Sequence, residues 1–147
     1  MKIQHSLGYL LNTSARLIKR KLDKHLKSYN ITTAQWAGLK LLSEEDNLSQ
    51  AEIADKTNAD RATCGAIIDK LILKGLLQKE LSENDRRSYR VKILPPALAI
   101  VDEVTLLAES INTLAVEGLT DTEISVFTKC LNTIISNLEG AKDDMDI

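Results

Sequence analysis

The sequence predicts a mainly α-helical protein with one small β-hairpin, and three features of the chain indicate this fold class. Apolar residues recur at helical spacing over most of the 147 residues. Capping boxes, in which Ser or Thr precedes Glu or Gln by three residues, open predicted helices at Thr32, Ser49 and Thr120. Strand-like segments occur together, between residues 76 and 93. The chain is therefore expected to arrange helices around a single hairpin.

Residues 49–93 hold the stretch around which the rest of the chain is organised. Ser49 can cap a short polar helix. Asp60 is suited to cap a second helix, which runs from Arg61 to Lys74 and carries one buried stripe. The residues of this stripe are spaced at i, i+3, i+4 and i+7, and they are Cys64, Ile67, Ile68 and Leu71.

A hairpin is predicted directly after the second helix. Gly75 fits a left-handed helix end, and residues 76–81 can form one strand. Tyr89, Val91 and Ile93 alternate with polar residues, which predicts a second, half-buried strand. Two helices followed by a hairpin predict a winged helix-turn-helix, which fits one helix into a DNA major groove and places the hairpin beside it.

The second helix leaves a bare surface away from its buried stripe. Gly65 and Ala66 have the short side chains that a helix needs where it approaches base edges closely, and Arg61 and Thr63 stand beside them. The alternative interpretation is that small residues merely allow two helices to pack. Taken alone, this part of the sequence leaves both interpretations open.

Charge is distributed unevenly along the chain. The formal net charge of −2 argues against DNA binding, because phosphate contacts need local positive charge. Residues 56–92, however, hold nine cationic and five anionic side chains, whereas residues 101–147 hold two cationic and ten anionic ones. The predicted winged helix therefore lies in the basic part of the chain.

Composition and motifs exclude several other classes. No segment approaches the roughly 20 apolar residues of a membrane span, and no signal peptide is recognisable, so we expect a cytoplasmic protein. Cys64 and Cys130 lack metal-ligand spacing, which favours reduced thiols. Without a catalytic constellation we expect no enzyme activity, no metal and no cofactor. A protein-docking adaptor is the competing interpretation, because winged helices sometimes serve that role.

Long amphipathic helices are predicted on both sides of the winged helix. The first covers about residues 3–28, and the second begins after Thr32 and ends near Glu44. Two more follow Pro96, to about Glu117 and then from Thr120 onward. These outer helices are too long merely to cover a compact winged helix. Their predicted apolar stripes include Leu7, Leu11, Ile18, Leu22, Leu26, Leu98, Val101, Val104, Ile111, Ile124, Phe127, Leu131 and Leu138.

Four motifs, in their order and spacing, resemble the MarR/SlyA family of bacterial transcriptional regulators. They are LeuSerGlnAlaGluIleAla at 48–54, AspArgAlaThr at 60–63, LysGlyLeuLeu at 74–77 and AspArgArg at 85–87. The resemblance covers essentially the whole chain. It implies one MarR-like domain over residues 1–147, with the winged helix-turn-helix at 32–93 and dimerisation helices at 1–30 and 96–139.

The resemblance also implies partners. Family members form isologous homodimers that present two recognition helices to a pseudo-palindromic operator in double-stranded DNA, usually as repressors. Arginines at the wing tip would enter the minor groove, where Asp85 would orient them. Ser49 and Gln50 could donate to phosphate. The implied DNA-binding residues are Ser49, Gln50, Asp60, Arg61, Thr63, Gly65, Ala66, Asp85, Arg86 and Arg87.

Regulation by a small aromatic or phenolic acid is a further implication of the resemblance. Such ligands bind between the dimerisation helices and the winged helix. Tyr9, Arg16, His25 and Trp36 could line a pocket of this kind, although Trp36 could equally be a core residue. A redox switch is the competing sensor hypothesis, but Cys64 and Cys130 lie in predicted helices and are interpreted as packing residues.

Overall fold

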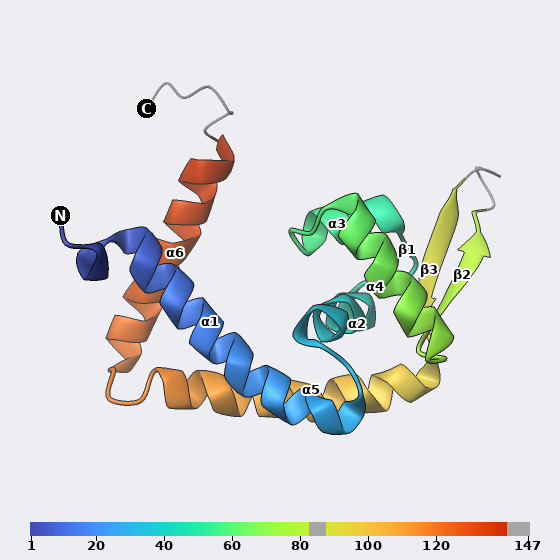
Figure 1. Cartoon of the computed structure of the whole chain (residues 1–147), viewed down its shortest axis with the longest axis horizontal. Helices are drawn as coiled ribbons and strands as arrows, with labels where there is room; N and C mark the ends of the chain where they lie inside the picture. Colours follow the sequence, from blue (N-terminus) through green and yellow to red (C-terminus); the bar gives the residue numbers. More distant parts are fainter. Residues whose placement is uncertain (83–87, 141–147) are drawn as a thin grey trace. The chain divides into compact units, whose positions relative to one another are not determined.

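Six α-helices, two short 3-10 helices and three strands form the computed structural model, which describes residues 1–82 and 88–140 (Figure 1). The chain divides into two compact units, residues 1–111 and 112–147. The predicted mainly helical fold with a small hairpin is confirmed. The elements are η1 (Ile3–His5), α1 (Leu7–Leu26), η2 (Lys27–Tyr29), α2 (Thr33–Glu44), β1 (Leu48–Ser49), α3 (Gln50–Lys56), α4 (Arg61–Leu73), β2 (Leu77–Leu81), β3 (Tyr89–Ile93), α5 (Pro95–Ala115) and α6 (Asp121–Gly140).

The first unit has one hydrophobic core, to which helices and strands both contribute. Leu26 at the end of α1, Leu39 of α2, Leu71 of α4, Val91 of β3 and Val104 of α5 are each 0% exposed. The winged helix-turn-helix therefore packs around the end of α1 and the first part of α5. Burial of these side chains removes apolar surface from water, which is the main stabilising contribution to such a unit.

The strands form one antiparallel sheet in the order β1-β3-β2. In the predicted hairpin, Leu77 pairs with Ile93 and Leu81 with Tyr89. The two-residue strand β1 was not expected, because Leu48 and Ser49 are too few to produce an alternating pattern. It exists because Leu48 pairs with Val91 across the sheet.

The capping signals are confirmed at each predicted helix start. At Thr32 and Ser49 both reciprocal hydrogen bonds of the capping box are present. At Thr120 the hydroxyl accepts from the Glu123 N–H at 3.1 Å, and the Glu123 carboxylate accepts from the Thr120 N–H at 3.0 Å. These bonds satisfy N–H groups that the first turn of a helix leaves free.

Two helices differ from the sequence prediction, one in its first residue and the other in which residue of its first turn is buried. The first α-helix begins at Leu7 instead of Ile3, because the Ser6 hydroxyl accepts the Tyr9 N–H and caps it there. In α5, Ala97 is fully buried whereas Leu98 is 42% exposed. The prediction that Leu98 begins the buried stripe of α5 was wrong by one residue. The helix starts at Pro95, and Ala97 faces the core together with Val101 and Val104.

Tyr89 is a third difference. Its side chain is 52% exposed, although the alternation placed it with the buried Val91. The register sets it opposite Leu81, which is 58% exposed, at the end of the hairpin farthest from the core. Alternation identifies the face of a strand, but burial also requires a packing element above that face.

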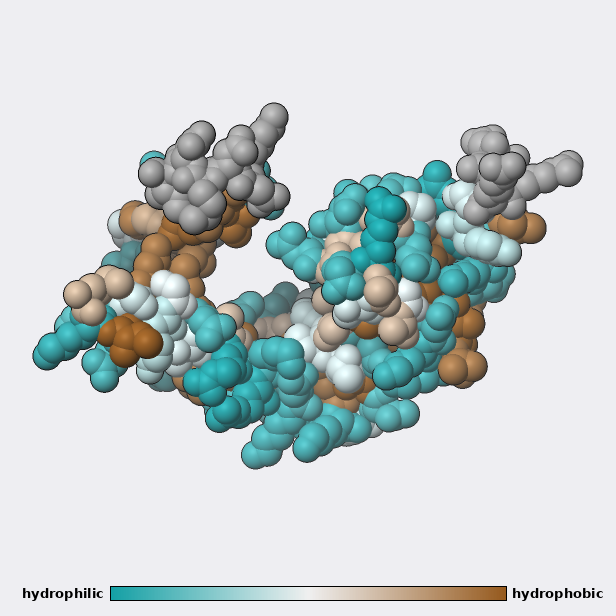
Figure 2. Space-filling view, turned by 45° about the horizontal axis from the view of Figure 1, so that its top comes forward, coloured by the Kyte–Doolittle hydropathy of each residue, from teal (hydrophilic) through white to brown (hydrophobic). Residues whose placement is uncertain are grey.

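The second unit consists of the end of α5 and the helix α6. Gly118 has a φ of +89° in the turn between them, a backbone conformation that residues with a side chain rarely adopt. Within the part of the chain that the structure describes, α6 buries none of its residues. Figure 2 shows apolar surface over α6, and Phe127 and Leu138 are 49% and 70% exposed.

No helix within residues 1–82 and 88–140 combines the length and apolar character needed to cross a membrane.

Candidate nucleic-acid interface

The helix α4 begins at a carboxylate cap. Asp60 Oδ1 accepts the Thr63 N–H at 2.8 Å, and Oδ2 accepts the Thr63 hydroxyl at 2.8 Å. The hydrogen bond from the Thr63 backbone is the main reason that the pKa of Asp60 is lowered. Asp60 is therefore ionised at neutral pH, and the Thr63 hydroxyl is directed to this cap.

One face of α4 is buried and the other is open. Cys64, Ile68 and Leu71 are buried, as the predicted stripe required, and Ile67 is half-buried. The exposed residues of the helix alternate between small, charged and apolar side chains, and Leu73 is 87% exposed. They are Arg61, Ala62, Thr63, Ala66, Asp69, Lys70 and Leu73.

Gly65 has a packing role that sequence reasoning left open. A Cβ atom at this position would lie 2.8 Å from Nε2 of Gln50, which is closer than such atoms approach. The neighbouring Cys64 thiol donates to the Gln50 carbonyl at 3.7 Å. Gly65 therefore lies against the Gln50 side chain at the start of α3, and a larger residue would require the end of that side chain to move, whereas Ala66 is exposed and available to a partner.

Most described cations of residues 56–92 are engaged within the protein. Four of them have acidic partners at 3.3 Å or less. Among the described residues of this segment, Arg61 and Lys70 are the cations for which no ion pair or hydrogen bond is found, and both lie on the exposed side of α4. The ion pairs are Lys56–Glu45, Lys79–Asp69, Arg90–Glu52 and Lys92–Glu80.

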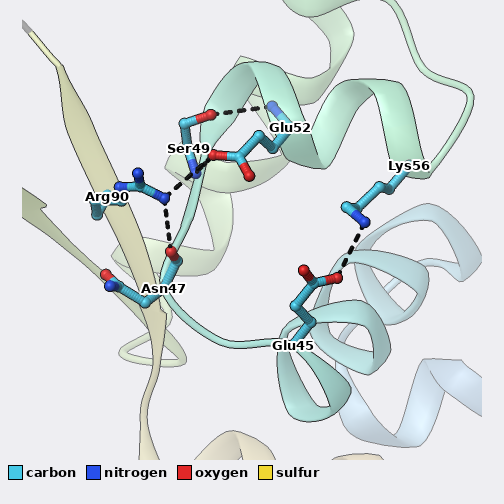
Figure 3. Close-up of polar contacts among 6 residues, drawn as sticks. All are labelled: Glu45, Asn47, Ser49, Glu52, Lys56 and Arg90. Carbon is cyan, nitrogen blue, oxygen red and sulfur yellow. Dashed lines mark hydrogen bonds and ion pairs between the residues drawn. The ribbon is translucent and has the colours of Figure 1, made fainter.

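Arg90 connects the hairpin to the start of α3 (Figure 3). Its Nη1 donates to the Asn47 carbonyl at 3.1 Å and to Glu52 Oε1 at 3.2 Å. Hydrogen bonds from Ser49 are the main cause of the lowered pKa of Glu52, which keeps this partner ionised. The sequence placed Arg90 on the polar face of a strand but carried no signal for this partner, 38 residues earlier.

Ser49 and Gln50 lie at the start of α3, close to α4. The Ser49 hydroxyl oxygen accepts the Glu52 N–H at 3.1 Å, so its own O–H is the group that could donate to a phosphate. Gln50 is half-buried against Gly65. The predicted wing-tip residues Asp85, Arg86 and Arg87 lie outside the described residues.

The four predicted ligand-binding residues are placed on two helices. Tyr9, Arg16 and His25 are exposed on α1, and Arg16 lines an open groove of about 530 Å³ together with four other residues of that helix and Lys27 of η2. Trp36 of α2 packs partly against the core and does not line this groove. Its buried Nε1 has no hydrogen-bond partner in the described part of the chain.

Metal and thiol chemistry receive no support from the described residues. Residues 1–82 and 88–140 contain no group of three His, Cys, Asp or Glu side chains that could hold a metal ion. Both cysteines are free thiols, with Cys64 buried and Cys130 exposed. The interpretation of Cys130 as a packing residue is not met in the described part of the chain, because Cys130 is exposed on α6.

A capped second helix with an open face, next to a hairpin, defines the class of winged helix-turn-helix proteins that bind DNA. The sequence model of the MarR family matches residues 31–89. The uncharacterized HTH-type transcriptional regulator YsmB of Bacillus subtilis (strain 168) is 31% identical over 129 residues, which are 88% of this chain and 86% of YsmB. The chain belongs to the MarR family of transcriptional regulators and is not an enzyme.

Solved structures show the same fold. A mutant of MarR from E. coli, complexed with operator DNA, has a TM-score of 0.81 at 22% identity, and the match covers 87% of this chain and 92% of that one. BpsR of Bordetella bronchiseptica, whose DNA binding is regulated by 6-hydroxynicotinic acid, has a TM-score of 0.85 at 24% identity, with 91% and 96% covered.

Proposed function

We propose that the protein is a homodimeric repressor that binds a pseudo-palindromic operator in double-stranded DNA through α4. The observation that carries this proposal is the open face of α4, which combines small side chains with the two unpaired cations Arg61 and Lys70. A helix in a major groove needs short residues near base edges and cations near phosphates. Such a regulator acts in the cytoplasm, where the operator is.

Residue roles follow from this orientation of α4. Ala62 and Ala66 would lie against base edges, and Arg61 and Lys70 would neutralise phosphates. Ser49 would donate to a phosphate at the start of α3. At the wing tip, Arg86 and Arg87 would enter the minor groove and Asp85 would orient them, as the family resemblance implies.

Exposed apolar residues at both ends of the chain support the homodimer. On α1, Leu7 and Leu10 are 58% and 50% exposed, and on α6, Val126 and Ile135 are 54% and 51% exposed. A second copy that covers these residues would remove a large apolar surface from water. Each protomer would then present its α4 to one half of the operator.

The DNA proposal is tested by genomic DNA selection with the purified protein, followed by fluorescence anisotropy on the recovered sequence at several salt concentrations. We expect a pseudo-palindrome that binds one dimer, with an affinity that falls steeply as salt rises. Arg61→Ala should weaken binding about tenfold and lower the salt slope by about one. Lys129→Ala, which removes the same charge from α6, should change neither. If no sequence is enriched, the protein-docking interpretation replaces this one.

We further propose that an aromatic carboxylic acid regulates DNA binding. Trp36 supports this, because its buried indole N–H has no hydrogen-bond acceptor in the described part of the chain. A carboxylate or hydroxyl oxygen of the ligand could be that acceptor. Trp36 is the single tryptophan of the chain, so its fluorescence reports directly on such a ligand. Titration with benzoate or 6-hydroxynicotinic acid should change this emission and the operator affinity together. An unchanged emission, an absence of heat by calorimetry and an unchanged affinity would refute the ligand proposal.

A further inference from the structure

Lys74, at the end of α4, is bound to the corner between α1 and α2. Its Nζ donates to the backbone carbonyl of Asn30 and, at 3.0 Å, to Oε1 of Gln35. These acceptors lie 44 and 39 residues earlier in the chain. Although the sequence counts Lys74 among the basic residues of the DNA-binding segment, its ammonium group is directed toward the protein.

The acceptors of Lys74 are held in fixed positions. Gln35 is 4% exposed, and its Oε1 also accepts the Thr32 N–H at 3.1 Å as part of the capping box of α2. Asn30 has a left-handed backbone with a φ of 55°, which fixes the direction of its carbonyl. Lys74 therefore binds a preformed pair of oxygens.

The same corner is attached to α1. Asp23 of α1 accepts the Thr33 N–H at 3.2 Å and also the Thr33 hydroxyl. Hydrogen bonds from Lys19 and Thr33 lower the pKa of Asp23, so this acceptor is charged at neutral pH. The first turn of α2 is thus bonded to α1 through Thr33 and to the end of α4 through Gln35.

Apolar packing alone does not define the tilt of α4. Its buried stripe of Cys64, Ile68 and Leu71 gains stability from burial, which has little directional preference. Hydrogen bonds depend strongly on distance and angle. The two bonds of Lys74 hold the end of α4 in one position relative to α2, while Gln50 and Gly65 are in close contact nearer its start.

We infer that Lys74 is a positioning residue, which sets the tilt of the recognition helix from the α1–α2 corner and does not neutralise a DNA phosphate. This inference rests on the proposed DNA-binding function of α4. If it is correct, loss of Lys74 weakens binding to the operator, where the helix must fit base edges. Binding to unrelated DNA, which depends on phosphate neutralisation, stays the same.

Lys74→Met and Lys70→Met form the matched pair for the test. Both remove one positive charge at positions one turn apart. Both residues are exposed, but the Lys74 ammonium donates two hydrogen bonds within the protein, whereas none is found for Lys70 in the described part of the chain. Anisotropy is measured on the selected operator and on a scrambled duplex of the same length, over a range of salt concentrations. Thermal melting of both variants establishes that they are folded at the assay temperature.

Lys74→Met is expected to lose about tenfold in operator affinity, with the salt slope and the affinity for scrambled DNA unchanged. Lys70→Met is expected to weaken both duplexes and to lower the slope by about one. A reduced slope for Lys74→Met, with equal losses on both duplexes, would show a phosphate contact and overturn the inference. An unchanged operator affinity would also overturn it.

Two further variants make the test independent of folding problems. Lys74→Arg keeps the charge, but a planar guanidinium cannot match two oxygens arranged around a compact ammonium, so operator affinity should still fall. A phosphate contact would instead tolerate arginine. In a double-mutant cycle, Lys74→Met and Gln35→Met should have non-additive effects on operator binding, and additivity would contradict the inference. If the wild-type protein selects no operator, the proposed function itself fails, whatever Lys74 does.

Discussion

The Asp60 carboxylate caps α4 at the place where the proposed DNA contact would bring a phosphate close. The cap itself needs an oxygen that accepts the Thr63 N–H, and a neutral side chain can supply it. The negative charge is not required for capping and would repel a phosphate. Asp60 is therefore the residue at which helix stability and DNA affinity make different demands.

Replacing Asp60 by Asn should separate these two effects. Asn caps helices about as well as Asp, so the melting temperature should change little. Operator affinity should rise about threefold, because one repulsive charge is removed. Asp121→Asn, which removes the same charge from the start of α6, is the control for anisotropy. A lower or unchanged affinity of the Asp60 variant would place phosphates away from this cap.

Cys64 shows how burial decides reactivity at a single residue. Burial raises the pKa of the Cys64 thiol, and its sulfur donates to the Gln50 carbonyl. The thiolate that reacts with oxidants and disulfide reagents is therefore scarce at neutral pH. Cys64 belongs to the packing between α3 and α4.

In a Cys130→Ser variant, the remaining thiol of the native protein should react with a disulfide reagent at least about a hundredfold more slowly than in guanidinium chloride. Because the pKa of Cys64 is raised, the native rate should begin to increase only at a pH above the ordinary range of thiols. Rapid reaction at pH 7, together with loss of operator binding, would revive the redox hypothesis.

At the scale of elements, the left-handed backbone conformation of Gly75 ends the helix α4. Its φ is +73°, its N–H donates to the Ile72 carbonyl at 3.0 Å, and the next N–H, of Leu76, donates to the Leu71 carbonyl at 3.0 Å. This is the Schellman arrangement, which satisfies carbonyls that the last turn leaves free. It directs the chain from α4 into the hairpin.

Gly75→Ala should therefore destabilise the protein by about 1 kcal/mol, because a Cβ atom disfavours the left-handed conformation. Gly8→Ala is the matched control, since Gly8 lies within α1, where a Cβ atom would meet nothing within 4 Å. The control should be neutral or stabilising by about 0.5 kcal/mol. Urea denaturation of both variants measures the difference. Equal stabilities would contradict a conformational role for Gly75.

Elements also differ in how well they can be predicted. The caps at Thr32, Ser49 and Thr120 and the turn at Gly75 were confirmed, because each depends on residues within one helical turn. The strand β1 was missed and the phase of α5 was wrong at Leu98. Both features depend on contacts with Val91 and the core, which lie far away in the sequence.

At the scale of the whole molecule, α6 buries none of its residues within the part of the chain that the structure describes. Leu131 belongs to its apolar stripe, whereas the adjacent Asn132 lies on a polar face with Thr128, Lys129 and Ser136. A helix with one apolar face normally buries that face against another element. The proposed homodimer supplies this element from a second copy.

Leu131→Asp should weaken the dimer at least about a hundredfold, because it places an unpaired charge in the proposed interface. Asn132→Asp adds the same charge one residue away, on the polar face, and should leave the dimer intact. Sedimentation velocity over a range of concentrations distinguishes the two variants. A Leu131 variant that remains as dimeric as the control would exclude α6 from the interface.

The sequence by itself determined the features that depend on neighbours along the chain. Capping boxes, the left-handed turn at Gly75, the buried stripe of α4 and the ordered motifs of the MarR family were readable without coordinates. Hydrogen bonds between residues three or four positions apart, and the periodicity of helices and strands, are local properties. They were sufficient to predict the winged helix-turn-helix and the family.

The tertiary structure alone decided which charges and small residues are available to DNA. Lys74 and Arg90 are cations in the basic segment, but their acceptors lie 38 to 44 residues away, and the structure assigns both to internal bonds. Gly65 is a candidate for base contact by sequence, and the structure places the Gln50 side chain against it. Whether a side chain is free to contact DNA depends on its distance from residues that are remote in sequence. Composition and periodicity carry no information about such distances.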